Sequence, residues 1–196
     1  MSGDTFLDKR TTVRKIGSVG KPCLHLEVAI WDDGDRAVPP DALGEIVLRG
    51  PKVFKGYWKD PEATATAFRG GWFHTGDIGS LDYEGFLYIV DRKKDMIVSG
   101  GENIASPEVE RALYEHPAVL EAAVVGSPDP RWGEVPVAFV VCRPGATATE
   151  EELREFCLAR LARFKVPRAV RFIDALPRNP SGKVLKRVLR EQATTR

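Results

Sequence analysis

A few charged side chains beside glycines could do chemistry in this sequence. Asp77 stands in Thr75-Gly76-Asp77, where an apolar strand pattern breaks at a glycine. A carboxylate at such a point can accept two hydrogen bonds from adjacent hydroxyls, as acidic residues do from a nucleotide ribose. An ordinary turn aspartate is the plainer interpretation of the same residue. The spacing alone leaves both open.

Arg92 and Lys183 carry positive charge that could meet a phosphate. Arg92 offers a planar fork of donors suited to ribose or phosphate oxygens, although most arginines at a domain edge face solvent. Lys183 lies in a turn, Asn-Pro-Ser-Gly-Lys, just before a helical pattern. An ammonium on a flexible stem can neutralise charge that develops when a carboxylate attacks an α-phosphate. A loop lysine in water is the competing interpretation.

The stretch 91–110, DRKKDMIVSGGENIASPEVE, contains a charged joint, a short strand, a double glycine and a helix start. Ser106 and Pro107 predict the helix start, because serine is a good N-cap and proline suits the first helical position. Gly100 and Gly101 lack β-carbons, so another group can approach the backbone closely there. A hairpin followed by a surface helix is the plainer interpretation of this spacing.

The elements around these residues fall into two regions. Residues 1–15 are polar without apolar periodicity, and we expect a flexible lead-in. Residues 20–90 alternate apolar and polar positions between closely spaced turns, from a strand that begins at Leu24 onward. A short helix is expected to start at Asp60 and Pro61. This region therefore predicts a small β barrel or meander.

From Ser106 onward the pattern is helix, strand, strand, helix, strand, helix. Thr149 and Glu152 form a capping box at the start of the second helix. Together the two regions predict an α+β fold, with residues 1–92 as a β-rich subdomain and 93–196 as a small α+β domain after a hinge.

Composition excludes several classes of function. The 29 basic and 28 acidic residues leave a net charge of +1, which gives no electrostatic case for nucleic acid or an anionic membrane. We expect no membrane span and no signal peptide, and therefore a cytoplasmic protein. The histidines lack metal-ligand spacing, so no metal site is expected on the protein. Three widely spaced cysteines, Cys23, Cys142 and Cys157, predict reduced, buried thiols.

Three motifs, taken in order, resemble those of the adenylate-forming superfamily. They are WFHTGDIG at 72–79, the stretch at 91–110, and LPRNPSGKVLKR at 176–187. The superfamily includes acyl- and aryl-CoA synthetases, luciferases and the adenylation domains of peptide synthetases. The resemblance covers nearly all of the chain from about Gly17. SGGENIASPEVE and FKGYWKDPEATATAF look most like the fatty and medium-chain acyl-CoA ligases.

The resemblance implies a role for each charged residue. By this similarity Asp77 holds the ribose of ATP and of the acyl-adenylate, and Arg92 also contacts the nucleotide. Lys94 matches the hinge about which a mobile lid domain swings between two half-reactions, a task that needs only a backbone dihedral change. Lys183 matches the catalytic lysine of the adenylation step.

The resemblance also implies a coenzyme A site. Gly100 and Gly101 resemble the glycines that line the pantetheine tunnel, and Trp132 matches a position near bound CoA in some relatives. A packed loop tryptophan is the competing interpretation of Trp132. Val166 departs from relatives that carry a basic residue before the proline, which puts a CoA phosphate contact there in doubt.

Two motifs of the superfamily are absent from this sequence. One is the Ser/Thr/Gly-rich phosphate loop with its lysine, and the other is the aromatic-Gly-x-Thr-Glu motif whose glutamate helps to hold Mg²⁺. We therefore expect the C-terminal portion of an acid–CoA ligase that uses ATP, CoA and Mg²⁺, with the Mg²⁺ ligands upstream. Such a chain is expected to be inactive alone and to pair with the N-terminal domain or with itself.

Two other interpretations remain open. Adenylation domains that load a carrier protein share these motifs, so the acceptor could be a carrier rather than CoA. A non-catalytic interaction module is the second, since the phosphate loop is absent.

Overall fold

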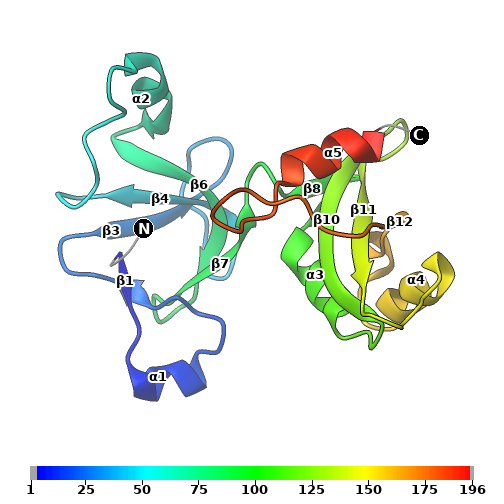
Figure 1. Ribbon diagram of the computed structural model, residues 1–196. Helices are drawn as coiled ribbons and strands as arrows, with labels where there is room; N and C mark the ends of the chain where they lie inside the picture. Colours follow the sequence, from blue (N-terminus) through cyan, green and yellow to red (C-terminus); the bar gives the residue numbers. More distant parts are fainter. Residues whose placement is uncertain (1–3, 195–196) are drawn as a thin grey trace. The chain divides into compact units, whose positions relative to one another are not determined.

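The computed structural model describes residues 4–194 and divides the chain into two compact units, Met1–Lys94 and Asp95–Arg196 (Figure 1). The division comes directly after the charged run Asp91-Arg92-Lys93-Lys94. The domain boundary that we predict, between residues 92 and 93, lies two residues earlier. The predicted α+β class is confirmed, since strands and helices mix along the chain.

The first unit is built on a five-stranded antiparallel sheet. Strand β3 (Glu27–Trp31) pairs with β4 (Gly44–Arg49), and β4 pairs with β6 (Trp72–Leu81). Strand β6 also pairs with β5 (Phe68–Arg69) and β7 (Leu87–Arg92). Its apolar side chains form the core of the unit, namely Leu26, Ile30, Ile46, Leu48 and Leu87. The prediction of a β-rich unit with closely spaced antiparallel strands is confirmed, but the order is not a simple meander, because β4 pairs with β6 and not with the next strand, β5.

The lead-in is more ordered than we predict from its sequence. Residues 1–3 lie outside the described part of the chain, but β1 (Thr5–Phe6) pairs with β2 (Lys21–Pro22) and α1 spans Lys9–Arg14. Asp8 is the N-cap of this helix, and its Oδ1 accepts hydrogen bonds from the main-chain N–H groups of Arg10 and Thr11. Lys15, just after it, pairs with Asp82 at 2.6 Å. The prediction of a flexible lead-in is wrong here, because a cap and ion pairs hold a helix that has no apolar face.

Two further details of the first unit can be compared with their predictions. The strand predicted from Leu24 starts only at Glu27, because His25 has φ of 64° and the side chain of Leu24 is 80% exposed. The short helix is present as α2 (Pro61–Ala67), with Asp60 accepting a hydrogen bond from the N–H of Ala63.

The second unit is a sheet with helices on both faces (Figure 1). Its centre is the hairpin of β10 (Val119–Asp129) and β11 (Gly133–Cys142). Strand β12 (Ala169–Phe172) runs parallel to β11, while β8 (Ile97–Ser99) pairs with the start of β11 and with β9 (Glu102–Ile104). Successive residues of β10 therefore point to opposite faces of the sheet and pack against different helices.

The helices divide between those two faces. Helices α3 (Ser106–Tyr114) and α4 (Glu150–Leu158) pack against one face with β10 residues such as Val124. Helix α5 (Lys186–Thr194) packs against the other with residues such as Val125. No described helix is long and apolar enough to cross a membrane.

The two predicted helix starts in this unit have different outcomes. The capping box is confirmed, since the Thr149 hydroxyl and the Glu152 carboxylate each accept the other's main-chain N–H. The N-cap predicted at Ser106 is wrong, because Ala105 occupies that position and Ser106 is the first helical residue. The Ser106 hydroxyl is buried instead and accepts a hydrogen bond from Lys186 Nζ.

Candidate functional site

The two residues predicted to hold a nucleotide lie opposite each other on neighbouring strands. Asp77 in β6 is the register partner of Arg92 at the end of β7, and Arg92 Nε lies 3.3 Å from Asp77 Oδ1. The Asp77 side chain is largely buried, whereas that of Arg92 is 56% exposed. The carboxylate is thus held by the sheet, and the guanidinium remains accessible to a ligand.

The turn before Asp77 is a bulge of β6. Glu45 is paired with Ile78 and Val47 with His74, so the residues between His74 and Ile78 protrude from the ladder. Gly76 has φ of 71° there, which favours glycine. Bulges of this kind re-aim side chains and are common next to functional sites.

The bulge lines a cavity of about 430 Å³. Its walls come from Thr75, Gly76, Arg92, Lys93 and Lys94. The predicted hinge residue and one of the predicted nucleotide residues therefore meet at the edge of the sheet, beside the turn that carries Asp77.

Behind the bulge lies a buried carboxylate that we did not predict from the sequence. Glu45 Oε1 accepts the Gly76 N–H at 3.1 Å, and its Oε2 lies 3.2 Å from Lys93 Nζ and 3.2 Å from His74 Nδ1. Burial raises the pKa of Glu45, but the hydrogen bonds from His74, Lys93 and Gly76 outweigh it and leave the pKa below its usual value. Its only signal in the sequence is a charge inside an apolar strand.

His74 is also buried in this cluster. Its Nδ1 lies 3.1 Å from Arg69 Nη2 as well as 3.2 Å from the Glu45 carboxylate. Its Nε2 is buried without a hydrogen-bond partner among residues 4–194. Within that same range, no group of three or more His, Cys, Asp or Glu side chains is arranged to hold a metal ion.

Lys183 lies in the second unit, in a loop that is held by internal hydrogen bonds. Asn179 Oδ1 accepts hydrogen bonds from the N–H groups of Ser181 and Lys183, and the Asn179 N–H donates to the Lys183 carbonyl. Arg178 Nη1 donates to the Gly182 carbonyl at 2.7 Å, and Arg178 Nη2 donates to Glu121 Oε1 on β10 at 2.5 Å. The Lys183 side chain is exposed and makes no ion pair with any described residue, so its ammonium is available to a ligand.

Two of the three residues predicted to bind CoA line one cavity of about 490 Å³ in the second unit. A β-carbon on Gly100 would lie 2.8 Å from Trp132 Cε3, so the glycine is needed for the ring to pack there. Gly101 does not belong to the lining, and a β-carbon there would meet no atom within 4 Å. The cavity is also lined by Phe164, Arg163 and Arg168.

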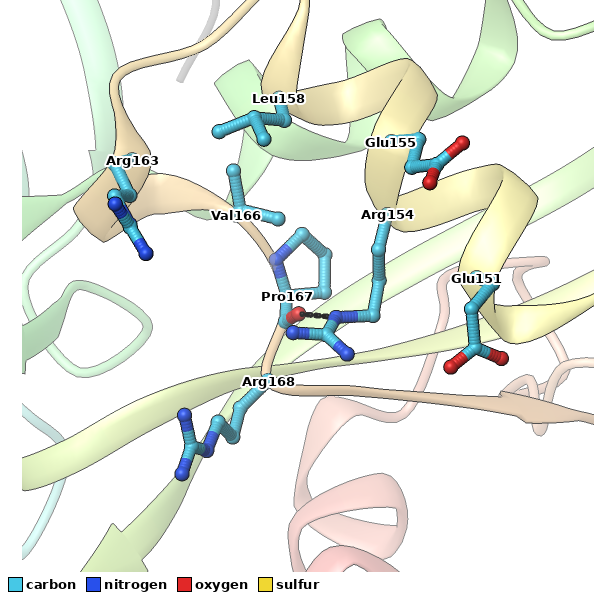
Figure 2. Close-up of a pocket in the computed structure, with 8 residues that line it drawn as sticks. All are labelled: Glu151, Arg154, Glu155, Leu158, Arg163, Val166, Pro167 and Arg168. Atoms are coloured by element: carbon cyan, nitrogen blue, oxygen red, sulfur yellow. Dashed lines mark hydrogen bonds between the residues drawn. The ribbon is translucent and has the colours of Figure 1, made fainter.

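A neighbouring cavity of about 350 Å³ shares Arg163 and Arg168 with the first (Figure 2). Arg154 of α4 points into this cavity and donates from Nε to the Pro167 carbonyl at 3.1 Å. Glu151 of the same helix also lines the cavity. Several basic side chains thus surround the loop in which Val166 departs from the family motif. Sequence reasoning passed over Arg163, whose signal is a basic residue just before that loop.

Lys165, the residue next to Val166, is engaged elsewhere. Its Nζ lies 2.7 Å from each carboxylate oxygen of Glu108, at the start of α3. Arg168, in contrast, lines both cavities. Of these two basic neighbours, Arg168 is therefore the one placed to meet an anion.

Comparison with known proteins places both parts of the chain in one family. Residues 108–183 match the AMP-binding enzyme C-terminal domain, and residues 1–58 match the AMP-binding enzyme domain. The 2-succinylbenzoate–CoA ligase of Geobacillus kaustophilus is 54% identical over 179 residues, which are 91% of this chain and 36% of the ligase. A feruloyl-CoA synthase from Amycolatopsis is 48% identical over 190 residues, 97% of this chain and 39% of that protein.

Solved structures agree with the sequence matches. The o-succinylbenzoate CoA synthetase (MenE) of Bacillus subtilis, in complex with its acyl-adenylate intermediate, superimposes with a TM-score of 0.89 at 43% identity. The match covers 96% of this chain and 38% of the synthetase. The same synthetase in complex with ATP and a magnesium ion gives a TM-score of 0.86 at 42% identity, over 98% of this chain and 38% of the synthetase.

This chain thus spans little more than a third of the length of the curated relatives that it matches. The order of its motifs, the two domain matches and the close superposition all agree. The chain belongs to the AMP-binding family of adenylate-forming enzymes and corresponds to its C-terminal portion.

Proposed function

We propose that this chain supplies the ribose contacts, the hinge and the catalytic lysine of an ATP-dependent acid–CoA ligase. In such a reaction a carboxylate oxygen attacks the α-phosphorus of ATP, and pyrophosphate leaves to give an acyl-adenylate. The thiol of CoA then attacks the acyl carbon, loses its proton, and releases AMP. The names of the relatives, a 2-succinylbenzoate–CoA ligase and a feruloyl-CoA synthase, support this class.

The observation that carries the proposal is the pair formed by Asp77 and Arg92 beside the cavity at the end of β7. The Asp77 carboxylate suits the two hydroxyls of a ribose, since carboxylate oxygens accept and hydroxyls donate. Arg92 can donate to ribose or phosphate oxygens from its exposed guanidinium. In this proposal Asp77 fixes the nucleotide and Arg92 completes its contacts.

Lys183 is proposed to act in the adenylation step. Its exposed ammonium, held on an ordered loop, would neutralise negative charge that builds on the α-phosphate as the carboxylate attacks. The backbone around Lys94 would absorb the dihedral change between the two half-reactions. Both roles rest on the resemblance and on the exposure of the residues.

The lining of the 490 Å³ cavity supports CoA as the acceptor. Trp132 and Phe164 are both partly exposed and offer ring faces, and Arg163 and Arg168 offer guanidinium groups for phosphates. Gly100 leaves room for the Trp132 ring beside them. A ligand with an aromatic base, phosphates and a thin chain fits this combination, and CoA has all three.

The proposal is tested by titrating a non-hydrolysable acyl-adenylate analogue into the chain by calorimetry. We expect binding by the wild type and at least a tenfold loss in Asp77→Ala, because about 1.4 kcal/mol corresponds to a factor of ten and hydrogen bonds to charged groups exceed this. Asp174→Ala, an exposed carboxylate in the second unit, is the matched control and is expected to bind as the wild type does. Equal binding by Asp77→Ala would contradict the ribose site.

A second experiment separates an enzyme from an interaction module. The chain is mixed with the separately expressed upstream region of a relative, and acid-dependent pyrophosphate release is measured. Activity that needs both parts and is lost in Lys183→Ala supports the ligase. Complex formation without any turnover would favour the interaction module instead.

A further inference from the structure

We propose that Glu45 is a positioning residue of the nucleotide site, acting with Lys93 through a closed ring of hydrogen bonds around Gly76. This inference rests on the proposed function, since it concerns how the ribose-binding turn is held. Neither Glu45 nor Lys93 is among the residues to which the family motifs assign a role here.

The ring is formed by three hydrogen bonds: one from main chain to side chain, one between main-chain groups and one between side chains. The Gly76 N–H donates to Glu45 Oε1 at 3.1 Å, and the Gly76 carbonyl accepts from the Lys93 N–H at 2.8 Å. The side chains of Lys93 and Glu45 then meet, with Nζ 3.2 Å from Oε2. Both main-chain groups of Gly76 are thus held by residues that also hold each other.

This arrangement solves a problem that the bulge creates. The turn leaves the β4–β6 ladder, so its main-chain groups lack the partners that a regular strand supplies. The Thr75 hydroxyl donates to the Ile46 carbonyl at 2.7 Å and accepts the Asp77 N–H at 3.1 Å. Glu45 and Lys93 satisfy both main-chain groups of Gly76.

The ring also couples the two proposed nucleotide contacts. Gly76 immediately precedes Asp77, and Lys93 immediately follows Arg92. Loss of the Glu45 carboxylate would displace Gly76. Because of these chain neighbours, the displacement would move Asp77 and also loosen the end of β7, where Arg92 lies. Small misplacements of a binding group are costly, about a hundredfold for 1 Å at a reacting centre.

The buried carboxylate is held in its charged form by this network. Its pKa lies below the usual value because the hydrogen bonds from His74, Lys93 and Gly76 outweigh burial. Lys93 also pairs with Asp33 at 2.8 Å, but that carboxylate is 91% exposed. Glu45, buried on β4, is the partner that can transmit position to the turn.

The first readout does not involve nucleotide. In the ¹⁵N-glycine-labelled chain, the Gly76 amide is followed in wild type, Glu45→Ala, Glu45→Gln and Lys93→Met. We expect its exchange to accelerate about tenfold or more in Glu45→Ala, because its acceptor is lost. Glu27→Gln is the matched control, since Glu27 pairs with Arg49 on the exposed side of the same sheet. An unchanged Gly76 amide in Glu45→Ala would overturn the ring.

The second readout is affinity for the acyl-adenylate analogue. We expect it to fall about tenfold in Glu45→Gln and in Lys93→Met, and the double variant to lose no more than the stronger single one, because the two act in one ring. Both substitutions nearly keep the side-chain size, so we expect both variants to fold. The amide signals of the other glycines check this. Additive losses, or unchanged affinity in both single variants, would overturn the positioning role.

The two proposals fail in distinguishable ways. A wild-type chain that does not bind the analogue contradicts the proposed function and this inference with it. Wild-type binding that survives in Glu45→Ala, Glu45→Gln and Lys93→Met contradicts only the inference.

Discussion

Glu45 shows how a buried charge can be retained in a small sheet. A carboxylate withdrawn from water is destabilised unless it is paired, and this one has donors from a histidine, a lysine and a main-chain N–H. Removing such a group leaves the histidine and the main-chain N–H without this acceptor, while Lys93 keeps only its contact with the exposed Asp33. The consequence is a dependence of stability on pH that a substitution can isolate.

Glu45→Gln is expected to flatten the acid side of the stability profile. Because the pKa of Glu45 is lowered in the folded chain, its contribution is fully present above the unfolded value of 4.5 and is lost as pH falls through the folded value. We expect the variant to be less stable by about 1–3 kcal/mol at pH 7 and the difference to shrink below pH 4.5. Urea unfolding at pH 7 and at low pH measures this, and a difference independent of pH would contradict it.

Cys157 is the other residue whose environment sets its chemistry. Its side chain is fully buried between α4 and the sheet, and burial raises the pKa of the thiol to about 11. The other two cysteines, Cys23 and Cys142, are only partly buried, which corrects the prediction of three buried thiols.

Alkylation at pH 8 should therefore distinguish the cysteines. About one Cys157 thiol in a thousand is ionised at that pH, and the thiolate is the reactive form. We expect iodoacetamide to modify Cys23 and Cys142 in the folded chain and Cys157 only after denaturation, as read by peptide mass spectrometry. Modification of Cys157 at the rate of the other two would contradict its burial.

At the scale of elements, the loops depend on particular glycines and caps. Helix α1 exists without an apolar face because Asp8 caps it, and α4 has a complete capping box. The double glycine after β8 shows a second dependence. Gly100 and Gly101 both have positive φ, 60° and 87°, but only Gly100 packs against a ring.

The pair Gly100→Ala and Gly101→Ala separates these effects. Both substitutions place alanine at positive φ, which costs about 1–2 kcal/mol. Gly100→Ala also brings a β-carbon to 2.8 Å from Trp132, so we expect a larger loss of stability and a changed tryptophan emission. Thermal unfolding and fluorescence test this, with Gly101→Ala as control. Equal effects of the two variants would show that Trp132 moves freely.

At the scale of the whole molecule, the proposed site residues are divided between the two units. The proposed ribose pair and the proposed hinge residue belong to the first unit, whereas Lys183 and the candidate CoA cavity belong to the second. The printed sequence contains no Ser/Thr/Gly-rich loop to bind the β- and γ-phosphates. Positioning of both reactants is a large part of such catalysis.

The chain by itself is therefore expected not to release pyrophosphate from ATP with any of a panel of aliphatic and aryl acids. A coupled pyrophosphate assay measures this, and a full-length relative is the positive control. Acid-dependent turnover by the purified chain, abolished in Lys183→Ala, would contradict the expectation. The same result would still support the catalytic role of the lysine.

The sequence by itself was sufficient for the α+β class, for most of the elements and for the family. These follow from local signals, such as apolar alternation, the capping box at Thr149 and contiguous motifs such as Thr75-Gly76-Asp77. Such signals depend on neighbours along the chain, so they can be interpreted without the fold. Helix α1 was missed because periodicity detects an apolar face and this helix has none.

Only the tertiary structure decided which residues contact the turn of the proposed site. Glu45, Gly76 and Lys93 are separated by up to 48 residues, and no local pattern links a strand carboxylate to a lysine after another strand. The same holds for Ser106, which was expected as a cap but is buried against Lys186, 80 residues away. Hydrogen bonds depend on distance in space, and pairing across the sheet sets that distance.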